Sequence, residues 1–318
     1  MKRVAFFITL CVALSFFAGC DKKLPDTLKG EIAFVSSMEN DGAHDIYVIT
    51  LPSKEVRQLT KTSGQDVENM YLDWCPTGQI AFASTRDRNY ELYLTNPDGS
   101  GETRLTKNDY DDLYPAMRWD GKQIAYSSTI LTSRGLPEKD IFIMDLATKK
   151  TERITNTPED EVSLRWSPDG KKLAYSRYVM GQSEIFVYDF ASKKSFQLTD
   201  NPAEDVNPAW TPDSKYIVFS STRLDSVNIG EDKLYSIFVM NAEDGSNVTT
   251  LLDDSKEGYS VGNPSISPDG LWLAYQYKHK DWDYMYIAVR RVDGKEDYTI
   301  VKNIYYNRNP VWNPMPPK

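Results

Sequence analysis

Histidine and helical patterning are scarce in this 318-residue chain, and its 37 basic residues are outnumbered by 46 acidic ones. It contains two histidines, and its net charge of −9 with a pI near 5.0 excludes the basic footprint that nucleic-acid binding requires. No stretch repeats apolar residues at a 3.6-residue period over a helical length, which excludes a helical protein. The chain also lacks a phosphate-binding glycine loop ahead of a helix. What is abundant is tyrosine, with 20 residues, which favours strands.

The first residues, MKRVAFFITLCVALSFFAGC, are typical of a secretory signal. A basic start precedes an apolar run from Val4 to Phe17, which is too short for a stable membrane span. The end, Phe17-Ala18-Gly19-Cys20, resembles a bacterial lipobox, with Phe17 where leucine is usual; an ordinary cleaved signal with an incidental cysteine is the alternative. We therefore expect a signal peptide over residues 1–19, a lipidated tether over 20–29 and a folded domain over 30–318.

Cysteine use follows from this expectation. Cys11 leaves with the signal, Cys20 carries the lipid, and Cys75 remains alone, so no disulfide forms within the mature chain. We interpret Cys75 as a surface or half-buried thiol and not as a nucleophile, because no histidine is near it in sequence. Acyl chains on Cys20 would hold the protein at the cell membrane or the outer membrane, on the periplasmic or extracytoplasmic side. Asp21 resembles a signal for inner-membrane retention, a rule that varies between bacterial groups.

The stretch WSPDGKKLAYS (166–176) is one copy of a repeat. The other copies are YLDWCPTGQIAFAS (71–84), MRWDGKQIAYSS (117–128), PAWTPDSKYIVFSS (208–221) and PSISPDGLWLAYQ (264–276). In each copy a Pro-Asp-Gly-like turn precedes an alternating strand, and a second and a third strand-like run follow. The period, between the mid-forties and mid-fifties, is that of a four-stranded propeller blade.

The two ends of the chain indicate how the ring closes. Six second-strand runs predict six blades: DIYVI, ELYLT, DIFIM, EIFVY, SIFVM and YMYIA. The first unit starts directly at GEIAFVSS (30–37), whereas the chain finishes on the tryptophan preamble NPVWNP (309–314) with no strand after it. We predict an all-β, six-bladed propeller of four-stranded blades in which the C-terminal strand completes blade one.

The pattern Pro-x-Trp-Ser-Pro-Asp-Gly-Lys-x-Ile-Ala-Phe, followed by Asp-Ile-Tyr and a Leu-Thr end, resembles the TolB-type propeller repeat from Gly30 to Pro314. The resemblance is strong for the fold and weak for function, since this propeller occurs in many proteins. It implies that one mouth of the central channel engages a partner. Oligogalacturonate lyases are similar in fold and bind a metal through several histidines, but His44 and His279 are too few to transfer that site. We expect both histidines to be solvated or packed in loops.

Polar residues precede each inner strand. The residues three positions ahead of the proline position are Asn69, Asp112, Glu161, Asp205, Val261 and Asn307, of which all but Val261 are polar. Because inner strands line the channel of a propeller, we expect this set to surround one mouth. Three interpretations stay open: turn chemistry alone, a site for a basic or amide-rich peptide, or a site for a hard cation such as Ca²⁺. No other cofactor and no metal ligand set is expected.

Two long loops, 130–140 and 222–234, and the aromatic stretch KHKDWDYMY (278–286) should lie on the same face as this mouth. Trp282 and Tyr284 could stack on a sugar or on a partner side chain, although Tyr284 also suits a core position. The leading hypothesis is a non-enzymatic, membrane-tethered monomer that binds an envelope protein or peptide. A carbohydrate-active or metal-dependent lyase-like enzyme using the same face is the alternative, and a purely structural envelope protein is the third.

Overall fold

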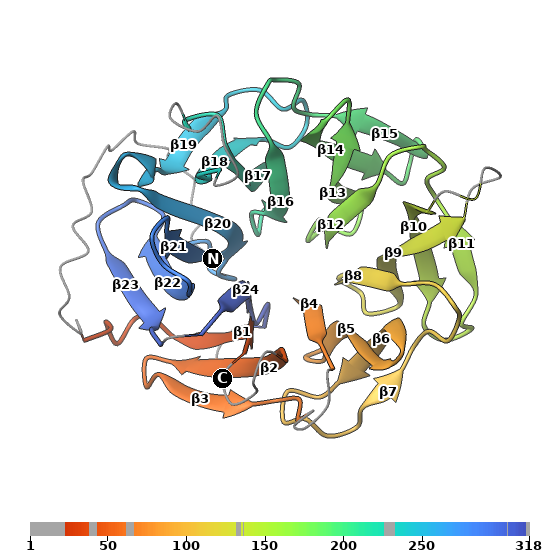
Figure 1. Ribbon diagram of the computed structural model, residues 1–318, viewed down its shortest axis with the longest axis horizontal. Helices are drawn as coiled ribbons and strands as arrows, with labels where there is room; N and C mark the ends of the chain where they lie inside the picture. The colour runs from red at the N-terminus through yellow and green to blue at the C-terminus, as the bar shows by residue number, and fades with distance from the viewer. Residues whose placement is uncertain are drawn as a thin grey trace.

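Six four-stranded antiparallel sheets are arranged around a central axis (Figure 1). The computed structural model describes residues 23–37, 43–61, 67–131, 135, 137–225, 233–303 and 305–315. The expected signal peptide, Cys20 and parts of the two long loops lie outside the described residues. The fold is the six-bladed propeller predicted from the repeat.

Each blade contributes one strand to the channel wall and three strands outside it. The inner strands are β4 (Asn69–Trp74), β8 (Asp112–Met117), β12 (Glu161–Trp166), β16 (Asp205–Trp210), β20 (Tyr259–Ile266) and β24 (Asn307–Trp312). The second strands are β1 (Gly30–Ser36), β5 (Ile80–Asp87), β9 (Gln123–Leu131), β13 (Lys172–Val179), β17 (Tyr216–Ser221) and β21 (Trp272–His279). The third strands are β2 (Asp45–Leu51), β6 (Asn89–Thr95), β10 (Pro137–Asp145), β14 (Gln182–Asp189), β18 (Ser236–Asn241) and β22 (Tyr286–Arg291). The outer strands are β3 (Glu55–Gln58), β7 (Thr103–Arg104), β11 (Thr151–Arg153), β15 (Lys194–Gln197), β19 (Thr249–Leu252) and β23 (Asp297–Val301).

The ring is closed by the C-terminal strand, as predicted. β24 pairs antiparallel with β1, and the sheet order of blade one is β24-β1-β2-β3. The Ser36 hydroxyl donates to Asn307 Oδ1 at 2.8 Å, which adds a buried side-chain bond across the junction. Pairing the last strand with the first removes the free edges that an open sheet would expose.

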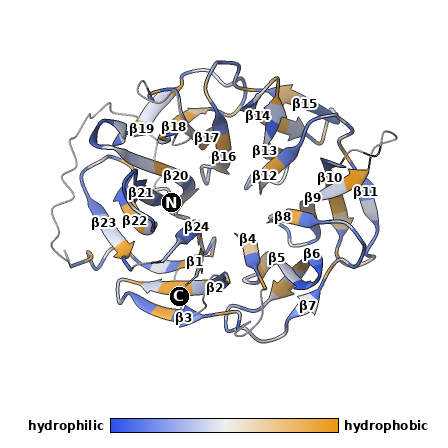
Figure 2. Cartoon of the chain, viewed as in Figure 1, coloured by the Kyte–Doolittle hydropathy of each residue, from blue (hydrophilic) through white to orange (hydrophobic). Residues whose placement is uncertain are grey.

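The hairpins form where the sequence has Ser-Pro-Asp-Gly or its variants. In blade four the Gly170 N–H donates to Ser167 O at 2.8 Å, and Gly170 has φ 69°, which favours glycine. The Ser167 hydroxyl donates to Asp169 Oδ1 at 2.7 Å. Apolar residues lie along the strands of the blades, and the connections are largely hydrophilic (Figure 2).

The core lies between neighbouring blades. The repeat tryptophans are buried in separate inter-blade clusters: Trp74, Trp166, Trp210 and Trp312. The described part of the expected tether also belongs to this core, since Leu24 and Leu28 are buried against Trp272 and Trp312. Residues 23–29 therefore pack on the propeller at the junction of blades six and one.

Helix contributes little to the described chain, which contains one 3₁₀ turn, η1 (Ser255–Glu257). A search of the described residues finds no helix with the length and apolar character needed to cross a bilayer.

Candidate functional site

The predicted mouth residues occupy equivalent positions but are closed off from solvent. Asn69, Asp112, Glu161, Asp205 and Asn307 each begin an inner strand, and Val261 lies near the start of β20. All six are 0% exposed. The expectation that these side chains surround an open mouth is wrong, because a partner outside the channel cannot reach them.

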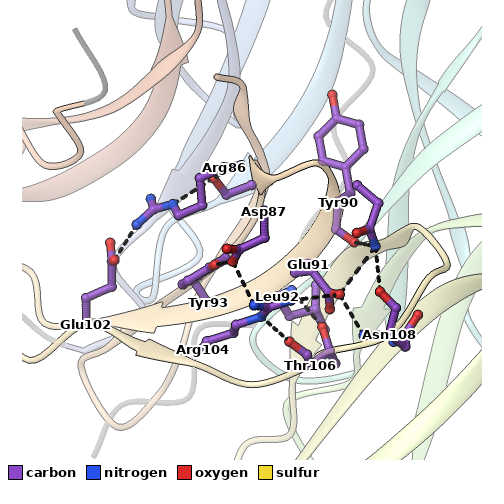
Figure 3. Close-up of polar contacts among 12 residues, drawn as sticks. Arg86, Asp87, Tyr90, Glu91, Leu92, Tyr93, Glu102, Arg104, Thr106 and Asn108 are labelled. Atoms are coloured by element: carbon purple, nitrogen blue, oxygen red, sulfur yellow. Dashed lines mark hydrogen bonds and ion pairs between the residues drawn. The ribbon is translucent and has the colours of Figure 1, made fainter. Parts of the chain in front are cut away.

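Polar contacts in blade two lead to one of these side chains, and Figure 3 shows the contacts around Glu91 and Arg104. Glu91, in the third strand β6, accepts from Arg104 Nη2 at 3.0 Å and from the Asn108 N–H at 2.8 Å. The Thr106 hydroxyl oxygen accepts the Leu92 N–H at 2.9 Å. Asn108 Nδ2 in turn donates to Asp112 Oδ2 at 2.8 Å. The loop that leaves one blade is thus tied to the inner strand of the next.

The same arrangement recurs in other blades. Between blades three and four, the Thr155 hydroxyl accepts the Ile141 N–H at 2.7 Å and donates to Glu161 Oε2 at 2.9 Å. Between blades four and five, the Thr199 hydroxyl donates to Glu184 Oε2 at 2.6 Å, and Asn201 reaches Asp205 Oδ2 at 2.7 Å. We call these acid, threonine and inner-strand groups the inter-blade network.

Arginines cover the network in three blades. Arg86, Arg177 and Arg223 contact Asn69, Glu161 and Asp205, respectively. Each guanidinium also lies over two aromatic rings of its own blade, with the shortest centroid distance in each blade between 4.4 and 4.8 Å. The aromatic rings cover one face of the guanidinium, and this stacking orients its planar N–H donors toward the carboxylate or amide.

Burial shifts the proton affinity of two network carboxyls. It raises the pKa of Glu161 to about 7, with Thr157 and Arg177 opposing the rise. It also raises the pKa of Asp112 above its ordinary value. These carboxyl groups form hydrogen bonds that connect neighbouring blades. This role agrees with the turn-chemistry interpretation, except that the contacts join two blades and not the residues of one loop.

The channel narrows immediately inside this ring. The third residue of each bulged inner-strand segment has a left-handed backbone, with φ between 50° and 58°, at Tyr71, Tyr114, Ser163, Asn207, Asn263 and Asn309. In every blade the inner-strand register shifts at this position, so these residues sit on β-bulges. The cavity that they line measures about 30 Å³. A peptide cannot pass through this neck without moving it.

A larger cavity lies at the opposite end of the channel, where the inner strands finish. It measures about 820 Å³, and we call it the funnel. Its wall includes Trp74, Met117, Trp166, Trp210, Ile266 and Trp312, with the hairpin prolines beside them. Trp119, which follows Met117 in blade three, is 47% exposed on the funnel and is the accessible ring.

The rim of the funnel is acidic. Asp169, Asp213 and Asp269 come from three successive hairpin turns, and each uses Oδ1 to cap its own turn. Deeper in the funnel, Asp73 accepts the Met117 N–H at 2.9 Å, and burial raises the pKa of this carboxyl. Arg165 lines both the funnel and the neck, so its cation lies at the bottom of the opening, and Lys29 adds a second basic side chain to the funnel wall.

The N-terminal segment runs along the same opening. Thr27 and Lys29 line the funnel, whereas Leu28 between them is buried in the core. The first described residues therefore approach the propeller on the funnel face, not on the face of the inter-blade network.

The other predicted residues lie on the network face or in the core. His44 Nε2 is 2.7 Å from Arg308 Nη2, and burial together with that cation lowers the pKa of His44. His279 packs against Tyr259 and Trp282. Cys75 is buried, which raises the pKa of its thiol well above the ordinary value and keeps it protonated. In the parts of the chain that the structure describes, no three His, Cys, Asp or Glu side chains converge as a metal site.

Trp282 and Tyr284 belong to an aromatic cluster on blade six. Their rings stack with centroids 5.1 Å apart, and Tyr284 stacks on Tyr286 at 5.2 Å. Both side chains are half-buried, so the expected exposed pair is partly a core element.

The sequence contains a signal for the network that its repeat alignment did not use. An acid begins four of the runs, DIYVI, ELYLT, DIFIM and EIFVY, and a threonine closes the same repeat unit fifteen residues later. The pairs are Asp45/Thr60, Glu91/Thr106, Asp140/Thr155 and Glu184/Thr199. For the funnel, the only local signal is Trp119, a tryptophan placed where other blades have the turn proline.

Residues 88–316 match the TolB beta propeller domain family. The Tol-Pal system protein TolB of Helicobacter hepaticus is 24% identical over 161 residues, which are 50% of this chain and 37% of that protein. The chain spans less than half the length of the first curated relatives that it matches.

Solved structures share the fold. The crystal structure of TolB from Acinetobacter baumannii superposes with a TM-score of 0.71 at 21% identity, covering 90% of this chain and 67% of that one. An oligogalacturonate lyase in complex with manganese superposes with a TM-score of 0.53 at 16% identity, covering 85% of this chain and 73% of the lyase. At these identities the likeness is evidence for the propeller alone.

Proposed function

The chain belongs to the TolB beta propeller domain family, and we propose that it is a lipid-anchored envelope protein that binds an extended segment of a partner protein in its funnel. The observation that carries the proposal is the funnel itself, about 820 Å³ in volume with tryptophan rings in its wall. Ligand sites are commonly concave, largely apolar and lined by a few polar groups, and this volume lies within their usual range. The name of the Helicobacter relative, a Tol-Pal system protein, supports a partner in a protein system.

Charge favours a particular kind of segment. The rim carboxylates of Asp213 and Asp269 use Oδ1 to cap their turns and form no ion pair with a described residue, whereas Asp169 Oδ2 lies 3.8 Å from Lys171 Nζ. The whole chain is acidic, with a net charge of −9. A segment with apolar side chains for the wall and basic or amide groups for the rim is complementary to this opening. The peptide site proposed from sequence thus moves from the network mouth to the funnel.

The anchor would set the orientation of this site. Leu24 is buried in the core and Thr27 lines the funnel. Four residues span at most about 14 Å, so a lipid on Cys20 would hold the funnel face close to the bilayer. The partner segment would then be one presented near the membrane surface, in the periplasm or on the extracytoplasmic side.

The enzyme alternative receives less support. A lyase-like site would place its catalytic groups at the network face, where the described His44 and His279 are engaged with Arg308 and with Tyr259 and Trp282. The fold is shared with a manganese-bound lyase, but this likeness does not extend to a ligand set on this chain. Metal analysis of the purified protein tests the alternative, since stoichiometric manganese, zinc or nickel would support it.

The binding proposal is tested by site-specific photocrosslinking in cells. A photoreactive residue replaces Trp119, which is 47% exposed in the funnel, or Tyr178, which is 52% exposed on the opposite face. We expect a discrete crosslinked protein from position 119 that is absent from position 178. Adding Asp213→Ala and Asp269→Ala to the Trp119 probe should reduce the yield.

Crosslinks from position 178 alone, or none from either position, would contradict binding in the funnel. The anchor is tested separately with Cys20→Ala. Loss of membrane association supports lipidation, and unchanged fractionation refutes it.

A further inference from the structure

A second cavity, of about 300 Å³, lies between blades five and six on the network face. Its wall includes Lys233, Lys278 and Lys280 together with Tyr235, Ser220, Ser260 and Gln276. Among the described residues, no Asp or Glu lines it, although the chain has 46 acidic and 37 basic residues. We call it the lysine pocket.

Two of the three lysines have charges that the described chain does not neutralise. Lys233 Nζ pairs with Glu204 Oε1 at 2.5 Å. Lys278 and Lys280 form no ion pair with a carboxylate of the described residues. Lys278 and Lys280 stand two residues apart at the end of β21, so two lysine side chains without a carboxylate partner among the described residues line one pocket of an acidic protein.

The two serine oxygens and the Tyr235 hydroxyl of the pocket already have partners. Ser220 Oγ accepts the Asn263 N–H at 3.1 Å, and Ser260 Oγ accepts the Tyr235 N–H at 3.1 Å. The Tyr235 hydroxyl donates to Glu204. Because both serine oxygens accept from backbone groups, their hydroxyl hydrogens remain to be donated.

Gln276 adds a further donor. Its Oε1 accepts the Asn309 N–H at 3.0 Å, which fixes the orientation of the amide and leaves Nε2 with no acceptor among the described residues. At the same strand position, blades four and five have Ser176 and Ser220, which accept the equivalent bulge N–H groups of Asn207 and Asn263. A serine in that contact keeps one O–H donor close to the strand, whereas glutamine brings an NH₂ group with two N–H donors to the pocket wall.

We propose that the lysine pocket binds a small molecule that carries a carboxylate or a phosphate group. The anionic oxygens accept from Gln276 Nε2 and the serine hydroxyls and pair with Lys278 and Lys280. Charged acceptors on such donors make stronger hydrogen bonds than neutral ones. This site is independent of the funnel, from which the neck separates it.

The test is calorimetric titration of the purified full-length protein with succinate, with inorganic phosphate and with succinamide, the neutral analogue of succinate. We expect binding of at least one anion with a Kd below about 1 mM at low salt, weakening as salt rises, and no binding of succinamide. Succinate alone would identify a carboxylate ligand, and phosphate alone a phosphate ligand.

Two variants with a matched control locate the site. Gln276→Glu retains an oxygen for the Asn309 N–H but places a negative charge in the pocket, so the Kd should rise at least tenfold. Lys278→Gln with Lys280→Gln should do the same. Lys171→Gln with Lys295→Gln removes equal charge at two side chains that are 77% exposed, and should leave the Kd unchanged.

The proposal is overturned if neither anion binds up to about 10 mM. It is also overturned if succinamide binds as tightly as succinate, or if the pocket variants keep the wild-type affinity while remaining folded.

Discussion

Removing the carboxylate of Asp205 should destabilise the propeller without touching its apolar core. Asp205 is 0% exposed, and its two oxygens lie 2.9 and 2.7 Å from Arg223 Nη2. Its Oδ2 also accepts from Asn201 Nδ2 at 2.7 Å. Asp205→Ala leaves the guanidinium without its counter-charge and the Asn201 amide without its acceptor.

The magnitude follows from the burial of the partner. Breaking a buried ion pair by deleting one member costs about 3–5 kcal/mol. The Arg223 side chain is 23% exposed, so water recovers part of its solvation, and the lower end applies. We expect the free energy of unfolding to fall by about 3 kcal/mol, which for a domain of this size lowers the Tm by roughly 5–10 °C.

The measurement is urea unfolding followed by tryptophan fluorescence. The matched control is Asp200→Ala, because Asp200 is exposed five residues earlier in the same loop, and its loss should cost less than about 0.5 kcal/mol. Arg223→Leu combined with Asp205→Ala should cost less than the sum of the two single variants, since neither charge is then left alone. If Asp205→Ala were as stable as the control, the inter-blade network would not support the frame.

Two further outcomes are expected. Glu161 has a pKa of about 7 in the folded state against an ordinary value of 4.5. Between these pH values the folded state therefore binds more protons than the unfolded state. The contribution of this group to stability is present below pH 4.5 and is lost as the pH rises through 7. Glu161→Gln should flatten that part of the stability profile, by no more than about 3 kcal/mol, and an unchanged slope would contradict the shift. Trp312→Ala, at the buried ring closure, should cost about 3–5 kcal/mol in urea unfolding. Trp119→Ala, in the exposed funnel wall, should cost little; equal losses would contradict closure by β24.

Most of the fold could be predicted from the sequence repeat. A hairpin that recurs with a tryptophan and a Pro-Asp-Gly turn specifies a blade, and the unpaired ends at Gly30 and Trp312 specify the closure. Both are local patterns with one structural solution, because a propeller strand without a partner would leave an exposed edge. Local pattern and global fold agree here, as they do in minimally frustrated sequences.

The expectation of an open polar ring was wrong because the partners of these residues lie outside the inner strand, in the loop that precedes it and in the strand that follows it. Asp112 and Glu161 look like an open acidic mouth when read along one strand. Their burial depends on loops such as Thr155 to Thr157, which reach across from the preceding blade. Replacing the ring carboxylates by alanine therefore perturbs the frame, and loss of partner capture in such a variant would not locate a binding site.

The funnel could not be placed from sequence for a related reason. A tryptophan that packs between blades and a tryptophan that faces the channel have the same neighbours along the chain. Trp74 and Trp312 do both, because an inner strand lies at once in the inter-blade core and in the channel wall. Only Trp119, displaced into the turn, departs from the pattern enough to indicate an exposed ring.

The neck gives the two cavities a common wall. Arg165 belongs to both the neck and the funnel, whereas Asn207 and Asn263 belong to both the neck and the lysine pocket. The backbone N–H groups of these two asparagines donate to Ser176 and Ser220 of the preceding blade. These bonds help to hold the left-handed backbone at each bulge. A left-handed non-glycine residue persists only where its surroundings hold it. Both openings are therefore preformed on a rigid frame, and a ligand at either end gains affinity because the site does not have to be ordered on binding.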